Sequence, residues 1–195
     1  MKLLKAVMKY IIIKLMDLIV FILIGILQLS SFLKMSQFIS LIPFSFGNIL
    51  RNRFYYKTLK LCGENCNFHF GTIITYRDII IGNNVSIGPY NTLGYVELGD
   101  NVITAQFVHI LSGNMQHGYE RNDVPIIKQK GILRTVHIGS DVWIGANSVI
   151  MNDVSNGCII GAGAVVTKPT KEYTIVAGNP GKCIKDRMLS GTAKN

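Results

Sequence analysis

A repeat of six residues constrains the fold of this chain more than any other feature of the sequence. From residue 80 onward an aliphatic residue recurs at every sixth position, and a small residue usually follows it. The copies read IGNNVS (81–86), IGPYNT (87–92), LGDNVI (98–103), IGSDVW (138–143) and IGANSV (144–149). The frame slips once after Gly94 and again within VSNGC (154–158). Because the spacing of six is maintained over so many copies, the sequence indicates repeated structural units.

A period of six suits a coil with three flat sides, in which each hexapeptide forms one side. The aliphatic residue would point into the prism, and glycine would follow where a Cβ atom would crowd the corner. An α-helix needs a period near 3.6, and it would tolerate the 19 glycines of this chain poorly. We therefore expect residues 61–178 to form five or six stacked turns of an all-β solenoid.

The first sixty residues differ from the rest in charge and hydropathy. They contain nine Lys and Arg but only one acid, Asp17, so they contribute +8 of the net charge of +9. This excess lies beside the apolar run Leu18–Leu33, which favours a membrane surface over a nucleic acid as partner. We expect residues 1–60 to be a helical segment, re-entrant or interfacial, with a break near Pro43 and Gly47. It would attach the protein to the cytoplasmic face of the bacterial inner membrane. A helical oligomerisation segment is the alternative.

The four cysteines, Cys62, Cys66, Cys158 and Cys183, are too few and too unevenly spaced to predict a disulfide framework. Cys62 and Cys66 are spaced like a metal-binding pair, but no second close pair of Cys or His accompanies them. We expect reduced thiols that contribute to packing.

The repeat is interrupted once, between Leu111 and His137, by SGNMQHGYERNDVPIIKQKGILRTV. A long excursion from a regular solenoid is typical of a functional loop. We therefore expect loop 112–137 to protrude from the solenoid and to carry the chemistry of the protein.

Three further strings, VWIGANSVI (142–150), IIGAGAVVTK (159–168) and YTIVAGNPGKCIK (173–185), accompany the hexapeptides. With them the chain resembles the left-handed parallel β-helix acyltransferases over residues 79–186. It is most similar to the bacterial polysaccharide O-acetyltransferases and to the galactoside, maltose and xenobiotic acetyltransferase group. The resemblance implies a left-handed β-helix over 61–186, a C-terminal tail at 187–195, and a homotrimer with active sites between subunits.

The same resemblance implies a catalytic base. In these enzymes a histidine in a local H-x-Y, followed by PI-x-x-Q, takes the acceptor's proton. Here the matching strings are HGY (117–119) and PIIKQ (125–129), so the role falls on His117. A neutral imidazole can remove the proton of a hydroxyl group while the oxygen attacks a thioester. A three-histidine zinc site, as in the γ-carbonic anhydrases, would need His109, His117 and His137, whose spacing does not match that family. We expect no metal.

The resemblance also implies the ligands. In the resembling enzymes the acyl donor is acetyl-CoA, so we expect acetyl-CoA here. The sequence contains neither a dinucleotide-binding turn nor a Walker loop, so the donor's phosphates would need other partners. The positions that match donor-binding residues of the family are Trp143, Ala146, Ala162, Thr167, Lys168, Lys182 and Lys185. Those assigned to the acceptor are Asn91, Tyr119 and Gln129.

Together these observations predict an acetyl-CoA-dependent O-acetyltransferase. The acceptor would be a sugar hydroxyl of a bacterial surface polysaccharide or of its lipid-linked precursor, and the acetyl group would pass to it directly. An N-acetyltransferase acting on an amino-sugar nucleotide is one alternative. A non-catalytic β-helical scaffold at the membrane is another. We expect no nucleic-acid partner.

Overall fold

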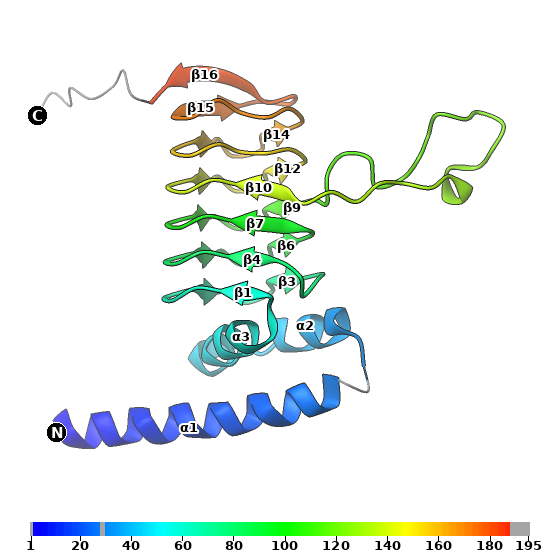
Figure 1. Ribbon diagram of the computed structural model, residues 1–195. Coiled ribbons are helices and arrows are strands. Elements are labelled where there is room, and N and C mark those ends of the chain that lie inside the picture. The colour runs from blue at the N-terminus through cyan, green and yellow to red at the C-terminus, as the bar shows by residue number, and fades with distance from the viewer. Residues whose placement is uncertain (1, 28–29, 188–195) are drawn as a thin grey trace, which may run out of the picture.

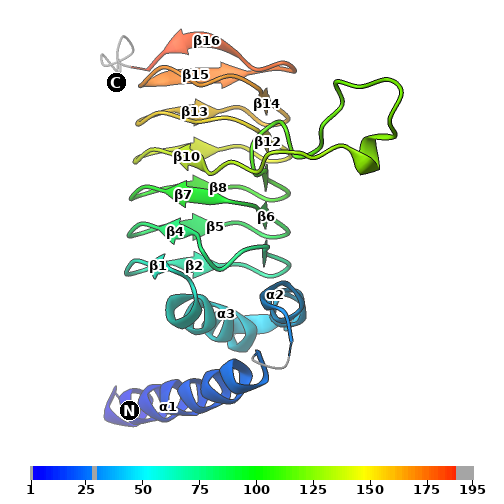
Figure 2. The same cartoon turned by 45° about the vertical axis from the view of Figure 1, so that its right-hand side comes forward.

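Three helices precede a tower of short strands in the computed structural model, which describes residues 2–27 and 30–187 (Figure 1). The helices are α1 (Lys2–Leu27), α2 (Phe32–Ser40) and α3 (Phe44–Thr58). The tower rises from α2 and α3, and a long loop leaves it on one side (Figure 2). A short 3-10 helix, η1 (Ile126–Lys128), lies in this loop.

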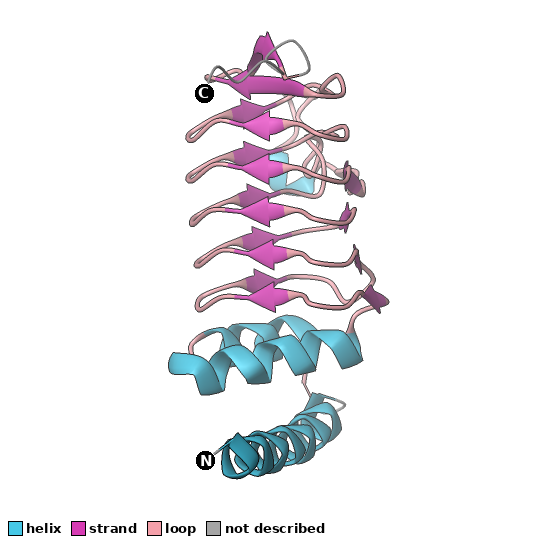
Figure 3. Cartoon of the chain, turned by 90° about the vertical axis from the view of Figure 1, so that its left-hand side faces the viewer, coloured by secondary structure: helices cyan, strands magenta, loops and turns pink. Residues whose placement is uncertain are grey.

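The strands form three sheets, one along each side of a prism (Figure 3). Sheet A contains β1 (Leu61–Cys62), β4 (Ile80–Ile81), β7 (Val96–Leu98) and β10 (Val136–Ile138). Sheet B contains β2 (Asn67–Phe68), β5 (Ser86–Ile87), β8 (Ile103–Thr104), β11 (Trp143–Ile144), β13 (Ile159–Ile160), β15 (Thr174–Ala177) and β16 (Lys182–Asp186). Sheet C contains β3 (Ile73–Ile74), β6 (Thr92–Leu93), β9 (His109–Ile110), β12 (Val149–Ile150) and β14 (Val165–Val166).

The register shows why the period is six. Neighbouring strands of one sheet pair in parallel, so Leu98 lies over Ile81 and Ile110 over Leu93. Among the strands of the described residues, only β16 runs antiparallel to its neighbour, β15. The inward residues are buried, and they form one continuous hydrophobic core. The prediction of a left-handed parallel β-helix of about six turns is therefore confirmed.

The corners between sheets A and B explain the small residue that follows each aliphatic one. A Cβ atom on Gly82 would lie 2.6 Å from the backbone of Gly99 in the next coil, so only glycine fits. Two residues later Asn84 has a positive φ of 56°, which asparagine tolerates better than most residues. Its side-chain amide donates to Asn101 at 3.1 Å and accepts from Asn65 at 3.2 Å. This asparagine ladder fixes the stacking of consecutive coils.

Helices α2 and α3 close the N-terminal end of the prism. The Ser36 hydroxyl on α2 accepts the backbone N–H of Ile74 at 2.8 Å and lies 2.7 Å from the Tyr55 hydroxyl on α3. The Tyr55 ring packs edge-on against Phe68 of β2. The helices thus cover the first coil, whose sheet edges would otherwise be exposed.

Arg51 on α3 holds this cap together. Its side chain is only 1% exposed, and it donates to the carbonyl oxygens of Phe68 (2.9 Å), Ile42 (2.8 Å) and Ile39 (3.2 Å). The last two lie at the C-terminal end of α2, where a cation is favourable. Gly47, one turn earlier, has no room for a side chain, because a Cβ atom there would lie 1.9 Å from the Ile42 oxygen.

Helix α1 packs against α3. This packing is one reason to correct the prediction of membrane attachment. Met16 and Val20 are buried, and the Asp17 carboxylate pairs with Arg53 (3.5 Å) and Lys57 (3.6 Å). The apolar run Leu18–Leu33 is divided, since α1 ends at Leu27 and α2 begins at Phe32. Among the residues that the structure describes, no helix combines the length and the apolar character needed to cross a bilayer. The predicted attachment of residues 1–60 to the inner membrane is therefore wrong.

The predicted helix break is confirmed at Pro43, which caps α3, whereas Gly47 lies inside that helix. Of the predicted tail at 187–195, only Arg187 falls within the described residues.

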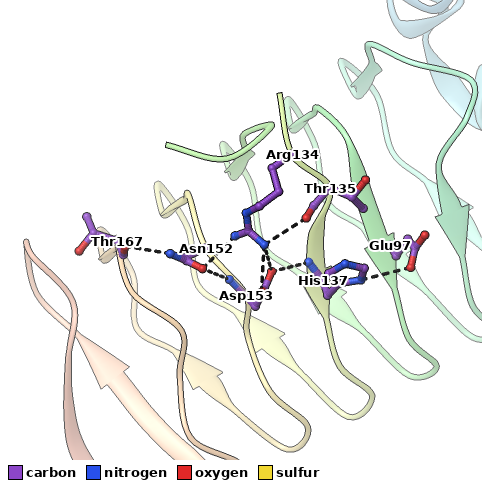
Figure 4. A network of polar contacts seen from close by, with 7 residues as sticks. All are labelled: Glu97, Arg134, Thr135, His137, Asn152, Asp153 and Thr167. Carbon is purple, nitrogen blue, oxygen red and sulfur yellow. Dashed lines mark hydrogen bonds and ion pairs between the residues drawn. The ribbon is translucent and has the colours of Figure 1, made fainter. Parts of the chain in front are cut away.

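The loop leaves the corner between sheets C and A and is anchored where it returns to the prism (Figure 4). The Arg134 guanidinium donates to both carboxylate oxygens of Asp153, at 2.9 and 3.0 Å, and to Asn152 Oδ1 at 2.8 Å. Asp153 also accepts the backbone N–H of His137 at 2.9 Å. The base of the loop is thereby fixed to the corner of the next coil.

We expect Arg51→Ala to lower the free energy of unfolding by about 3 kcal/mol, because three buried carbonyl groups lose their donor. Arg53→Ala is the matched control. Arg53 lies two residues further along α3 and makes a partly exposed ion pair, so its loss should cost less than about 1 kcal/mol. Denaturant unfolding of both variants checks this, and equal effects would contradict the role given to Arg51.

We expect Arg134→Ala to free the base of the loop without unfolding the prism. Chymotrypsin should then cleave at Tyr119 and Leu133 several-fold faster, as measured by mass spectrometry. In the control Arg121→Ala, the lost partner is Asp123, which lies in the loop itself. That variant should keep the original cleavage rate at Leu133. Equal rates in all three proteins would show that the Arg134 contacts do not hold the loop.

Candidate functional site in the loop

The loop that carries His117 is a ribbon of two arms that run side by side. The backbone N–H of Arg134 donates to Ser112 at 3.0 Å, and that of Ile132 donates to Met115 at 2.7 Å. Further out, a Cβ atom on Gly131 would lie 2.0 Å from the Gln116 oxygen and 2.6 Å from the His117 nitrogen. The absence of a side chain at Gly131 thus lets the returning arm lie directly against His117.

His117 and Tyr119 have exposed side chains in the single chain. A pocket of about 370 Å³ opens between the two arms beside them. Its lining includes Met115, Gly118, Glu120, Arg121, Val124, Lys128, Gln129, Lys130, Gly131 and Ile132, but neither His117 nor Tyr119. The imidazole is therefore accessible to a ligand, but one chain does not enclose it.

Gln129 has a different environment from the one that its predicted role needs. Its side-chain amide donates to the carbonyl oxygens of Arg121 (2.7 Å) and Val124 (2.8 Å), and its Oε1 accepts the Arg121 N–H at 3.1 Å. Gln129 thus closes the outer turn of the loop. Because these bonds occupy its polar atoms, Gln129 shapes the loop, and we leave it out of the acceptor site.

Asn91 lies inside the prism rather than at its surface. Its side chain is fully buried, its amide nitrogen donates to the Thr104 hydroxyl, and its Oδ1 accepts the Val108 N–H at 2.8 Å. Asn91 thus satisfies polar groups at an interior corner. A contact with an acceptor would require it to give up these bonds, so we do not retain Asn91 in the acceptor site.

The predicted donor-binding residues fall into separate groups. Trp143, which is 53% exposed, stands on the outer face of sheet B, and Lys182 and Lys185 lie on β16 of the same sheet. Ala146 and Ala162 lie in consecutive coils at the next corner, where the Gly163 N–H donates to the Ala146 oxygen at 2.8 Å.

Thr167 and Lys168 lie elsewhere, at the corner from which the loop emerges. The Thr167 carbonyl accepts from Asn152 at 3.1 Å, and Asn152 in turn accepts from Arg134 (Figure 4). Thr167 is thereby connected to the base of the His117 loop. One copy of the chain does not gather all seven predicted donor residues on one face.

A polar surface on sheet A lies beside the loop base. His137 Nδ1 is 3.2 Å from a carboxylate oxygen of Glu97, and both side chains line a pocket of about 450 Å³ with Asp153 and Glu172.

The three histidines considered for a zinc site lie on different elements. His137 lies on β10 of sheet A, His109 on β9 of sheet C, and His117 in the loop. Among the described residues, no three His, Cys, Asp or Glu side chains form a group that could hold a metal ion.

Sequence reasoning did not identify Arg134 and Gly131, which position the loop. Both lie at its returning end, immediately before the repeat resumes at Val136. An arginine and a glycine next to a repeat boundary are a weak signal, because their partners, Asp153 and Gln116, become apparent only when the coils are stacked.

The known proteins to which the chain is similar are acetyltransferases. A probable acetyltransferase of Mycobacterium tuberculosis is 32% identical over 128 residues, which make up 64% of this chain and 41% of that protein. A galactoside O-acetyltransferase of Lactococcus lactis is 26% identical over 159 residues, or 69% of this chain and 65% of that protein. The chain thus spans less than two thirds of the length of these relatives. No family model matches it.

Solved structures agree. A galactoside acetyltransferase in complex with coenzyme A superposes with a TM-score of 0.67 at 25% identity, covering 79% of this chain and 78% of that one. An N-acyltransferase from Bacillus cereus, in complex with coenzyme A and dTDP-4-amino-4,6-dideoxyglucose, gives a TM-score of 0.55 at 21% identity, covering 67% and 82%. In its repeat, its stacked coils and these relatives, the chain is similar to the hexapeptide-repeat acetyltransferases of the galactoside and maltose O-acetyltransferase type.

Proposed function

We propose that the protein transfers the acetyl group of acetyl-CoA to a hydroxyl group of a sugar, with His117 as the general base. One observation carries this proposal. The β-helix is interrupted by a single long loop, anchored at its base, and an accessible histidine lies where the backbones of the two arms touch. The relatives named acetyltransferases supply the reaction class, and the sugar-acetylating ones supply the acceptor class.

His117 would take the proton of the sugar hydroxyl while the oxygen attacks the thioester carbon. A positioned base of this kind contributes roughly 10²–10⁴-fold to the rate. The same imidazole, now protonated, can pass its proton to the departing thiolate, so direct transfer needs no covalent enzyme intermediate. Tyr119 is the one predicted acceptor residue whose side chain remains free to meet the sugar, since it is exposed two residues from His117.

The donor would be held by cations and by an aromatic surface. Lys182 and Lys185 lie on one strand at the C-terminal end of the prism, and exposed ammonium groups of this kind can pair with phosphates as point charges. Trp143 offers a flat apolar face on the same sheet. Ala146, which is partly exposed, and Ala162, which is exposed, would contact the donor at the neighbouring corner. Thr167 and Lys168, at the corner from which the loop emerges, complete the proposed set.

The complete site would form between copies of the chain in a homotrimer. The loop exposes apolar side chains, with Ile127 at 87%, Ile132 at 68% and Ile126 at 58%. On sheet B, Ile103 and Trp143 are exposed neighbours in register. Uncovered apolar groups on a loop and on a flat face favour contact with another protein surface. A neighbouring copy would cover both and bring the loop of one chain near the donor residues of another.

We expect His117→Ala to lower the transfer of radiolabelled acetyl groups from acetyl-CoA to a panel of sugars by at least about a hundredfold, because the base is lost. The affinity for coenzyme A, measured by calorimetry, should stay the same. His69→Ala is the control. That imidazole contacts the Asn67 side chain in the first coil, two coils before the loop, and its loss should leave turnover unchanged.

The product of this assay also separates the two enzymatic candidates. An O-acetyl ester is released by mild alkali, whereas the amide formed by an N-acetyltransferase is stable. Label that resists alkali on an amino-sugar acceptor would replace our proposal with the N-acetyltransferase. Unchanged turnover in His117→Ala would refute the base, and a folded protein that binds no coenzyme A would favour a non-catalytic scaffold.

We expect the double variant Lys182→Ala, Lys185→Ala to bind coenzyme A roughly tenfold or more weakly, because two charge-assisted contacts to phosphate are removed. Its binding of pantetheine, which lacks the phosphates, should not change. Lys60→Ala removes an exposed lysine at the other end of the prism and serves as control. An equal loss for pantetheine would indicate a structural defect rather than lost phosphate contacts.

A further inference from the structure

Two cysteines occupy interior positions of the first coil that are aliphatic in the coils stacked directly above it. The register places Cys62 below Ile81, which in turn lies below Leu98. The pairing of β2 with β5 likewise aligns Cys66 with Val85. In the second coil Ile81 and Val85 are both fully buried in the core. At one inner corner the first coil thus has a pair of thiols where the second coil has a pair of unreactive aliphatic side chains.

The two thiol groups interact with each other. Cys62 is buried, whereas Cys66 is only partly buried, and its sulfur also lies 3.1 Å from the Gly82 carbonyl oxygen. The hydrogen bond from Cys62 is the main cause that lowers the pKa of Cys66, while the same bond, together with burial, raises the pKa of Cys62. Within the pair, Cys66 is therefore the thiol that ionises more easily. This asymmetry is typical of an attacking and a resolving cysteine.

A pocket gives small molecules access to this pair. It has a volume of about 430 Å³ and is lined by both cysteines, by Gly63, Glu64 and Asn65 between them, and by Asn52, Arg53 and Tyr56 of α3. Of its charged groups, Arg53 favours a thiolate and Glu64 opposes it, while the Asp17 carboxylate pairs with Arg53. Asp100 in the adjacent coil also raises the pKa of Cys66, but this effect is smaller than that of the Cys62 hydrogen bond.

We propose that Cys62 and Cys66 form a dithiol site that hydrogen peroxide oxidises reversibly to a disulfide. The Cys66 thiolate attacks the peroxide, the O–O bond breaks, and a sulfenic acid forms as hydroxide leaves. The Cys62 sulfur then attacks the Cys66 sulfur, the S–O bond breaks, and water leaves. In total the two thiols lose two protons and two electrons, and one peroxide molecule becomes two water molecules. A dithiol reductant reverses the step by exchange.

The other two cysteines serve as internal references. Cys158 is fully buried, and its sulfur lies 3.0 Å from the Lys171 carbonyl oxygen and 3.3 Å from the Thr170 hydroxyl. Cys183 is exposed on β16, where its sulfur contacts the Lys185 carbonyl oxygen at 3.8 Å. Peroxide should leave Cys158 reduced and convert Cys183 to oxygen adducts.

Mass spectrometry of the peroxide-treated, folded full chain tests the proposal. After alkylation of free thiols, trypsin releases residues 61–77, which contain both cysteines and no internal cleavage site. We expect this peptide to escape alkylation and to lose the mass of two hydrogen atoms, and dithiothreitol applied before alkylation should restore it. The proposal is overturned if the peptide remains fully alkylated under conditions that oxidise Cys183.

A matched pair of variants identifies the partner. In Cys62→Val, which introduces an aliphatic residue like those at this position in other coils, Cys66 should gain oxygen atoms and the two-hydrogen loss should disappear. In the control Cys158→Val, the loss should persist at the wild-type rate. The same two-hydrogen loss in Cys62→Val, or oxygen adducts in place of it in the wild-type chain, would refute the pairing.

Discussion

The structure depends on the burial of aliphatic columns inside the prism. Most strands contribute one inward side chain, while β7 and β10 contribute two. The strand above covers each of them in register, as Ile81 covers Cys62 and Leu98 covers Ile81. Such stacking needs backbone hydrogen bonds along the prism axis and corners without bulky side chains. Gly82 and the asparagine ladder through Asn84 satisfy the second condition. Each coil is hydrogen-bonded to the coils above and below it. A segment of the chain can therefore leave the prism, provided that the strand after it still pairs with the coil below.

The loop at residues 112–137 uses this property. Val136 pairs with Val96, 40 positions earlier in the chain, so the prism continues as if the insertion were absent. Arg134 then fixes the returning arm to Asp153, and the close approach at Gly131 holds the other arm against it. The Arg134 contacts and the close approach at Gly131 together fix the backbone of His117 relative to the prism. An interrupted solenoid can therefore position a reactive side chain although the loop has few buried contacts of its own.

The regular part of this molecule was predictable because a period of six translates directly into register. The helical segment was less predictable, because an apolar run such as Leu18–Leu33 could pack against a bilayer or against the end of a β-helix. Packing decides between them, and Met16 and Arg51 are buried against protein. The role of Asn91 was also not predictable. The sequence shows an asparagine near a corner, but it does not show that the side-chain amide points into the prism and donates to Thr104. The role of His117 stays a prediction, derived from a local string rather than from geometry.

The division of the proposed ligand residues over the prism bears on assembly. His117 leaves from the corner between sheets C and A, whereas Trp143 and Lys185 stand on sheet B, the opposite side. A donor bound at the proposed phosphate-binding cations of one copy would therefore lie on a different side of the prism from the base of that copy's His117 loop. Packing prisms side by side around a threefold axis sets a corner of one copy against a face of the next. The loop also exposes Ile127, and we propose that a neighbouring copy covers this side chain and that two chains share the active site.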